Sequence, residues 1–130
     1  MTRVRNISLV LLLVASFGCA GVYRGTITLT AAVDSAAQEY ATIYKYKTVP
    51  VSEETHSKVL SAHARYQQFA GVAYDALLAY KLSGDATQYQ QAFEAARSAG
   101  LAFANLVIPF FTKNKAESTV NNIMNAKAVL

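Results

Sequence analysis

Few side chains in this 130-residue chain could perform chemistry, since it holds two histidines, one cysteine and eight acidic residues. The one spacing typical of a metal site is Glu53-x-x-His56. Di-iron bundles need two such pairs and two further carboxylates. His63 lies about 10.5 Å along a helix from His56, too far for both rings to bind one ion directly. We therefore predict no metal site and interpret Glu53, Glu54 and His56 as solvated residues of a helix's first turn.

The remaining candidates for cofactor binding or catalysis are also incomplete. His63 lies beside an apolar stripe, where a bundle could supply an axial haem ligand, but the sequence has no Cys-x-x-Cys-His motif and places no second histidine opposite it. Ser57, Ser61 and Asp75 share a predicted helix with the histidines, yet no Gly-x-Ser-x-Gly motif accompanies them. The sequence thus predicts no cofactor and a protein that is not an enzyme.

The elements that carry these residues are predicted to be helices. With 53% hydrophobic and 15% charged residues, the chain can fold as one packed domain. Four segments repeat apolar residues every three or four positions, as one helix face requires: 30–47, 52–82, 85–107 and 116–129. The predicted core stripe of the second segment is Val59, Ala62 or His63, Tyr66, Phe69, Ala73, Leu77 and Tyr80. The stripe of the third is Tyr89, Phe93, Ala96, Gly100, Phe103, Val107 and Phe110.

Local signals predict where these helices begin and end. Ser52 is a good N-cap residue, and Gly84 suits a left-handed C-cap. Asp85 and Gln88 have the spacing of a capping box, and Pro109 should stop the third helix near residue 107. Residues 112–115 are interpreted as a polar turn. Because the connections are short, we expect an all-α, antiparallel, up-down-up-down bundle of three to four helices.

Tyrosine is unusually prominent in the predicted helices, whereas tryptophan is absent. A tyrosine at a core boundary packs its ring while its hydroxyl reaches water or a carbonyl. The alternative is an aromatic surface that binds a partner helix, a glycan strand or a small apolar ligand. Tyr44 and Tyr74 lie off the predicted stripes, so they are the candidate binding residues.

The N-terminus has the layout of a signal peptide. Arg3 and Arg5 precede an uncharged run at 7–17. At 1.5 Å per residue this run reaches only about 17 Å, against about 30 Å for the hydrocarbon core of a bilayer. It is therefore short for a permanent membrane span. Residues 19–29 contain Gly21 and Gly25 and are interpreted as a spacer that leads into the first helix.

The segment Ala-Ser-Phe-Gly-Cys-Ala at 15–20 resembles the lipobox of bacterial lipoproteins, in which a small residue precedes the acylated cysteine. The resemblance implies cleavage between Gly18 and Cys19, a diacylglyceryl group on Cys19 and acylation of the new terminus. Ala20 follows where aspartate would favour the inner membrane, which implies the outer membrane and a periplasmic face. Two alternatives stay open: ordinary secretion with cleavage after Ala20, and an uncleaved anchor. The expected organisation is a signal peptide at 1–18, the acylated cysteine and tether at 19–29, and the bundle at 30–130.

Charge argues against nucleic acid as a partner. Removing 1–18 takes away Arg3 and Arg5, so the formal charge falls from +4 to +2, and the remaining basic residues are scattered rather than clustered. We expect a non-enzymatic envelope lipoprotein that is a structural or protein-interaction module, with another envelope protein or a second copy as partner. The alternative is a lipoprotein that binds a small apolar ligand between its helices.

Overall fold

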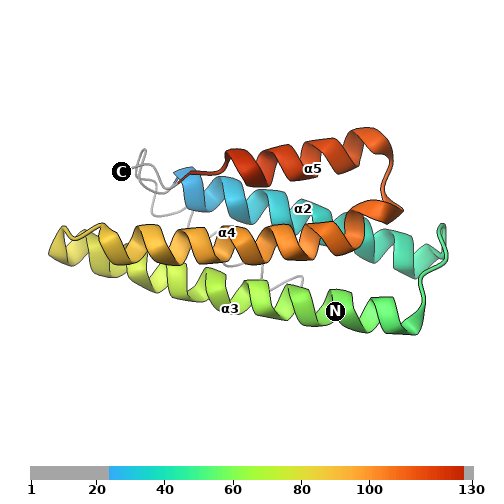
Figure 1. Ribbon diagram of the computed structural model, residues 1–130, viewed down its shortest axis with the longest axis horizontal. Coiled ribbons are helices and arrows are strands. Elements are labelled where there is room, and N and C mark those ends of the chain that lie inside the picture. Colours follow the sequence, from blue (N-terminus) through green and yellow to red (C-terminus); the bar gives the residue numbers. More distant parts are fainter. Residues whose placement is uncertain (1–23, 128–130) are drawn as a thin grey trace.

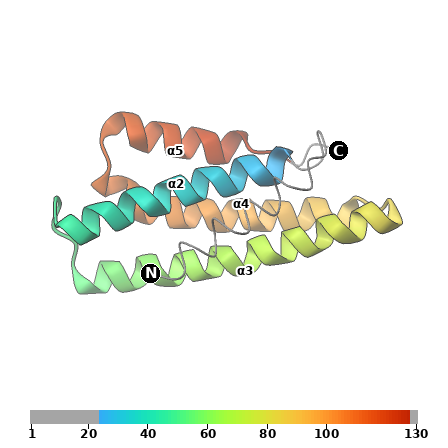
Figure 2. The ribbon, with the colours of Figure 1, turned by 180° about the vertical axis from the view of Figure 1, so that it is seen from behind.

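The computed structural model describes residues 24–127, which form an antiparallel bundle of four α-helices (Figures 1 and 2). Successive helices run in opposite directions, so the predicted all-α, up-down-up-down architecture is confirmed (Figure 1). The elements are α2 (Arg24–Tyr46), α3 (Glu53–Ser83), α4 (Thr87–Val107), the short 3-10 helix η2 (Ile108–Phe110) and α5 (Lys113–Asn125).

Helix α3 has both ends that its sequence predicts, and α4 ends where the sequence predicts. Ser52 caps α3, with its Oγ accepting a hydrogen bond from the backbone N–H of Thr55 (3.1 Å). Gly84 ends α3 in the left-handed region at φ 74°, and its N–H donates to the carbonyl of Tyr80 (2.8 Å). Helix α4 ends at Val107, two positions before Pro109, as predicted.

Helix α2 begins at Arg24 rather than near residue 30, so interpreting 24–29 as part of a spacer was wrong. The reason is tertiary packing: Thr26 and Leu29 are buried, and Thr26 Oγ1 is hydrogen-bonded to the hydroxyl of Tyr89 on α4 (2.8 Å). Contacts of this kind override the weak preference of β-branched residues for strands. The predicted lipidation and cleavage residues, Gly18 and Cys19, lie outside the described residues.

Two other helix starts differ from the sequence prediction. Helix α4 begins at Thr87. The side chain of Asp85 accepts a hydrogen bond from the backbone N–H of Thr87 (3.0 Å), two residues on, rather than from that of Gln88. The predicted capping box of Asp85 and Gln88 was therefore wrong. Helix α5 begins at Lys113, because the side chain of Thr112 caps its first turn. Residues 113–115 are therefore helical rather than a turn.

The core lies where α4 meets the other helices. The longest side-by-side packing is between α3 and α4, while α2 contacts α3 least among the pairs of neighbouring helices. Gly100 permits a close approach of α2 to α4, since a Cβ at this position would lie 3.0 Å from Cγ2 of the buried Val33. Within residues 24–127, no helix is both long and apolar enough to cross a bilayer.

Two buried tyrosines provide a matched test of how hydroxyl groups affect this core. The Tyr89 hydroxyl is bonded to Thr26, whereas the Tyr66 hydroxyl is buried without a hydrogen bond of good geometry to any described residue. We expect Tyr89→Phe to lower the free energy of unfolding by about 0.5–1.5 kcal/mol, and Tyr66→Phe to leave it unchanged or raise it by about 1 kcal/mol. Urea unfolding measures both values. Equal losses would contradict the finding that only the Tyr89 hydroxyl of this pair is hydrogen-bonded.

The stability of the protein at alkaline pH gives a second test of the buried Tyr66. Burial raises the pKa of Tyr66 to about 12, although the nearby hydroxyl of Thr30 lowers it in part. The folded state therefore holds this proton more tightly than the unfolded state. The stability linked to Tyr66 is complete below pH 10 and is lost as the pH rises towards about 12. Tyr66→Phe should lose less stability than the unmodified protein across this window.

Candidate functional site

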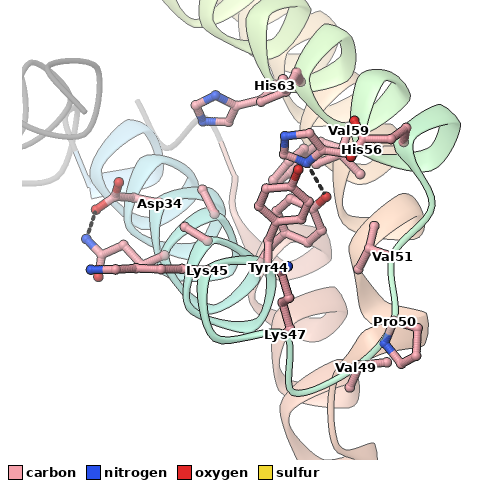
Figure 3. A pocket seen from close by; sticks show the side chains of 17 residues that line it. Asp34, Tyr44, Lys45, Lys47, Val49, Pro50, Val51, His56, Val59 and His63 are labelled. Carbon is pink, nitrogen blue, oxygen red and sulfur yellow. Dashed lines mark hydrogen bonds between the residues drawn. The ribbon is translucent and has the colours of Figure 1, made fainter.

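A groove of about 930 Å³ lies between α2 and α3, near the loop that joins them (Figure 3). Its position follows from the sparse contact between these two helices, because few side chains fill the space between them. The lining is mainly apolar and aromatic, and Phe103 on α4 also contributes to it. Its apolar and aromatic residues are Ala37, Tyr40, Ala41, Tyr44, Val49, Pro50, Val51, His56, Val59, Leu60, His63 and Phe103.

An aromatic cluster of Tyr40, Tyr44 and His56 links the two helices at this groove. The His56 ring is stacked parallel on Tyr44, with ring centroids 3.7 Å apart. The Tyr40 hydroxyl and His56 Nδ1 share a hydrogen bond of 2.7 Å. Interpreting His56 as a solvated residue was therefore wrong: it is half-buried, whereas Glu53 and Glu54 are exposed as predicted.

Burial raises the pKa of Tyr40, and the charges of Tyr44 and Glu53 raise it further. The phenol therefore keeps its proton at neutral pH, and it donates to Nδ1 in the imidazole tautomer whose ring proton is on Nε2. The cluster thus positions the imidazole by a hydrogen bond to one ring and by stacking on the other.

The charged residues of the groove nearly balance. Asp34 and Glu53 are acidic, and Lys45 and Lys47 are basic. Burial raises the pKa of Asp34, whose carboxylate accepts a hydrogen bond from the side chain of Gln38 (3.1 Å). Since neither sign dominates, the groove has no strong preference for an anionic or a cationic ligand, and apolar and aromatic contacts determine what it can bind.

Leu60 and His63 show how the groove is open on one side and closed on the other. Leu60 lies on its rim with 50% of its surface exposed, while the neighbouring Val59 is only 2% exposed. His63 points from α3 toward the α2 side of the groove (Figure 3). Its ring packs against Phe103, with ring centroids 5.2 Å apart. An occupant would therefore meet an aromatic floor and an apolar rim.

The two tyrosines singled out from the sequence lie far apart. Tyr44 lies in the groove, stacked on His56. Tyr74 is half-buried on α3 and does not line the groove. It lies eighteen residues beyond His56, or about 27 Å along the helix. The structure therefore does not bring Tyr44 and Tyr74 into one site.

Sequence reasoning missed the contact between Tyr40 and His56. One signal was present: Tyr40 and Tyr44 are spaced i, i+4, so they share a helix face. A short connection then brings this face close to the first turn of α3. Among the described residues, no three histidine, cysteine, aspartate or glutamate side chains lie together as a metal site would require.

No protein-family model, curated protein or solved structure matches this chain.

Proposed function

We propose that this protein is a non-enzymatic lipoprotein of the bacterial envelope whose helical bundle binds a protein partner through the groove between α2 and α3. The lipobox-like segment ending at Cys19 supports the anchor, and the position of Ala20 favours the outer membrane with the bundle in the periplasm. The groove supports the binding role, because it is a large apolar and aromatic concavity on a helical scaffold.

The observation that carries the protein-binding role is the half-exposed rim of the groove. Small-molecule sites usually enclose most of the ligand, whereas this groove is open along a rim where Leu60 is 50% exposed. An open apolar channel beside a helix suits an amphipathic segment that lays its apolar face between α2 and α3. Tyr44 and His56 would then contact that face, and Lys45 and Glu53 would lie near its polar edges.

Site-specific crosslinking tests this proposal with a matched pair of positions. Leu60 and Val72 are both exposed apolar residues of α3, at 50% and 57%, but only Leu60 lines the groove. A photoreactive phenylalanine at position 60, in living cells, should give one discrete protein adduct that is absent at position 72. Adding Tyr44→Ala should lower the adduct yield several-fold. The same adducts at both positions, or none at position 60, would refute binding through the groove.

A second candidate function is favoured by the size of the groove. Its volume of about 930 Å³ falls within the range of roughly 300–1,000 Å³ that is typical of ligand pockets. In this alternative the occupant is a small apolar ligand held against Tyr44 and Phe103. The fluorescence of an uncharged apolar dye should then increase when the purified protein is added. Leu60→Trp should block this dye binding, whereas Val72→Trp should not. Equal dye binding by both variants would exclude this site.

A further inference from the structure

The tip of the α3–α4 hairpin projects beyond the start of α2 (Figures 1 and 2). The hydrogen bond between Tyr40 and His56 places these two residues at the same level of the bundle. Arg24 precedes Tyr40 by sixteen residues, so on the antiparallel α3 it lies level with about residue 72. Helix α3 continues to Ser83, which extends it past this level by about 16 Å.

The start of α2 and the hairpin tip lie at the same end of the molecule. The hydrogen bond between Thr26 and Tyr89 shows this directly, since Tyr89 is in the first turn of α4, immediately after the tip. Arg24 lies five positions after Cys19, and five residue steps of extended chain span at most about 17 Å. Acyl groups on Cys19 would therefore hold this end of the bundle within about 17 Å of the membrane, which matches the projection of the hairpin.

The hairpin tip exposes apolar side chains. Leu82 is 91% exposed, the highest value among the large hydrophobic residues that are exposed in the described part of the chain. Leu78, one turn earlier on the same face, is 39% exposed. A leucine exposed to this degree makes almost no contact with the rest of the bundle, so core packing does not account for its apolar side chain.

We propose that the tip of the α3–α4 hairpin contacts the lipid bilayer that anchors Cys19, with Leu82 in the interfacial region. This inference rests on the lipid anchor of the proposed function. The backbone N–H of Thr87 stabilises the charged carboxylate of Asp85 and lowers its pKa, so the loop keeps a negative charge. Lys81, in the last turn of α3, carries the opposite charge. The tip therefore has no net charge, and the partner surface we propose is a zwitterionic phospholipid surface.

A second contact besides the acyl chains fixes the orientation of the bundle. A tether alone leaves the bundle free to rotate, whereas tether and hairpin tip together define an axis that points away from the membrane. The groove residue Leu60 lies twenty-two residues before Leu82 on α3, about 33 Å farther from the bilayer. The proposed binding site would thus face the periplasm at a fixed height.

A polarity-sensitive fluorophore on the acylated protein tests this contact. Cys19 is the one cysteine of the chain and its thiol would be acylated, so Leu82→Cys offers a single site for labelling. The matched control is Tyr46→Cys, which is also exposed and apolar, at 66%, but lies at the other end of α2. Both labelled proteins are reconstituted into phosphatidylcholine and phosphatidylethanolamine vesicles, with nitroxide-bearing lipids as quenchers.

We expect the label at position 82 to shift to shorter wavelength and to be quenched at least twofold more than the label at position 46. Leu78→Cys should give an intermediate value. Equal quenching at positions 82 and 46, or none at position 82, would overturn the inference while the protein still floats with the vesicles. A protein that carries no acyl group and does not float would instead refute the lipid anchor itself, so the two failures are distinguishable.

Discussion

Phe93→Ala is expected to lower the free energy of unfolding by about 3–5 kcal/mol, the range for truncating a fully buried phenylalanine. Phe93 has no exposed surface and packs on α4 beside Tyr89, with ring centroids 6.0 Å apart. Domains of this size are stable by about 5–15 kcal/mol. Phe93→Ala therefore removes a large share of the free energy of unfolding and should lower the Tm by more than about 10 °C.

Phe69→Ala is the matched control, because Phe69 is also a helical phenylalanine but is only half-buried on α3. Its truncation leaves a smaller cavity, since part of the ring already faces water, and we expect a loss less than half as large. Thermal unfolding followed by circular dichroism measures both variants. A loss for Phe93→Ala no greater than for Phe69→Ala would show that the centre of the bundle does not lie along α4 as described.

The core of α4 was predictable from the sequence because it follows helical periodicity alone. The predicted stripe included Phe93, Gly100 and Phe103, and all three are buried. The ends of α3 were predictable for a similar reason, since Ser52 and Gly84 act through backbone groups only a few residues away. Periodicity and capping are local properties, so they need no knowledge of which helices become neighbours.

The start of α2 and the groove were not predictable in this way. The sequence around Thr26 resembles a strand or spacer, and it becomes helical because it packs on Tyr89, a residue far along the chain. The hydrogen bond between Tyr40 and His56 depends on how the short connection aligns two helices. Tyr44 was identified as a candidate because it lies off the apolar stripe, but its stacking partner His56 lies on another helix. Contacts of this kind are set by tertiary geometry rather than by spacing.

Cys19→Ala is expected to abolish incorporation of labelled palmitate entirely and to release the bundle from the membrane fraction. A thiol is required for the thioether that carries the diacylglyceryl group, and alanine cannot form this bond. Each buried CH₂ of an acyl chain contributes about 0.8 kcal/mol, so two or three chains give stable attachment whereas one is marginal. Losing all of them removes the main source of membrane affinity in the proposal.

Membrane fractionation of Cys19→Ala does not by itself report on acylation, because the apolar run at 7–17 of the unprocessed variant could hold it on the membrane. A second version, with the chain from Ala20 onward placed behind an ordinary cleavable secretion signal, lacks both that run and the thiol. It should be soluble in the periplasm. Its circular dichroism should match that of the bundle that Cys19→Ala releases from the membrane, since folding depends on contacts within α2 to α5.

The N-terminal residue of the unmodified protein then decides among the three processing routes. Mass spectrometry should find an acylated Cys19 at the terminus if the lipobox resemblance holds. A terminus at Gly21, without label, would mean ordinary secretion after Ala20. A terminus at Met1, with Cys19→Ala still sedimenting with membranes, would mean an uncleaved anchor. Either of the last two results would mean that Cys19 carries no acyl groups. Both the proposed membrane anchor and the proposed contact of the α3–α4 hairpin tip with the bilayer would then lose their basis.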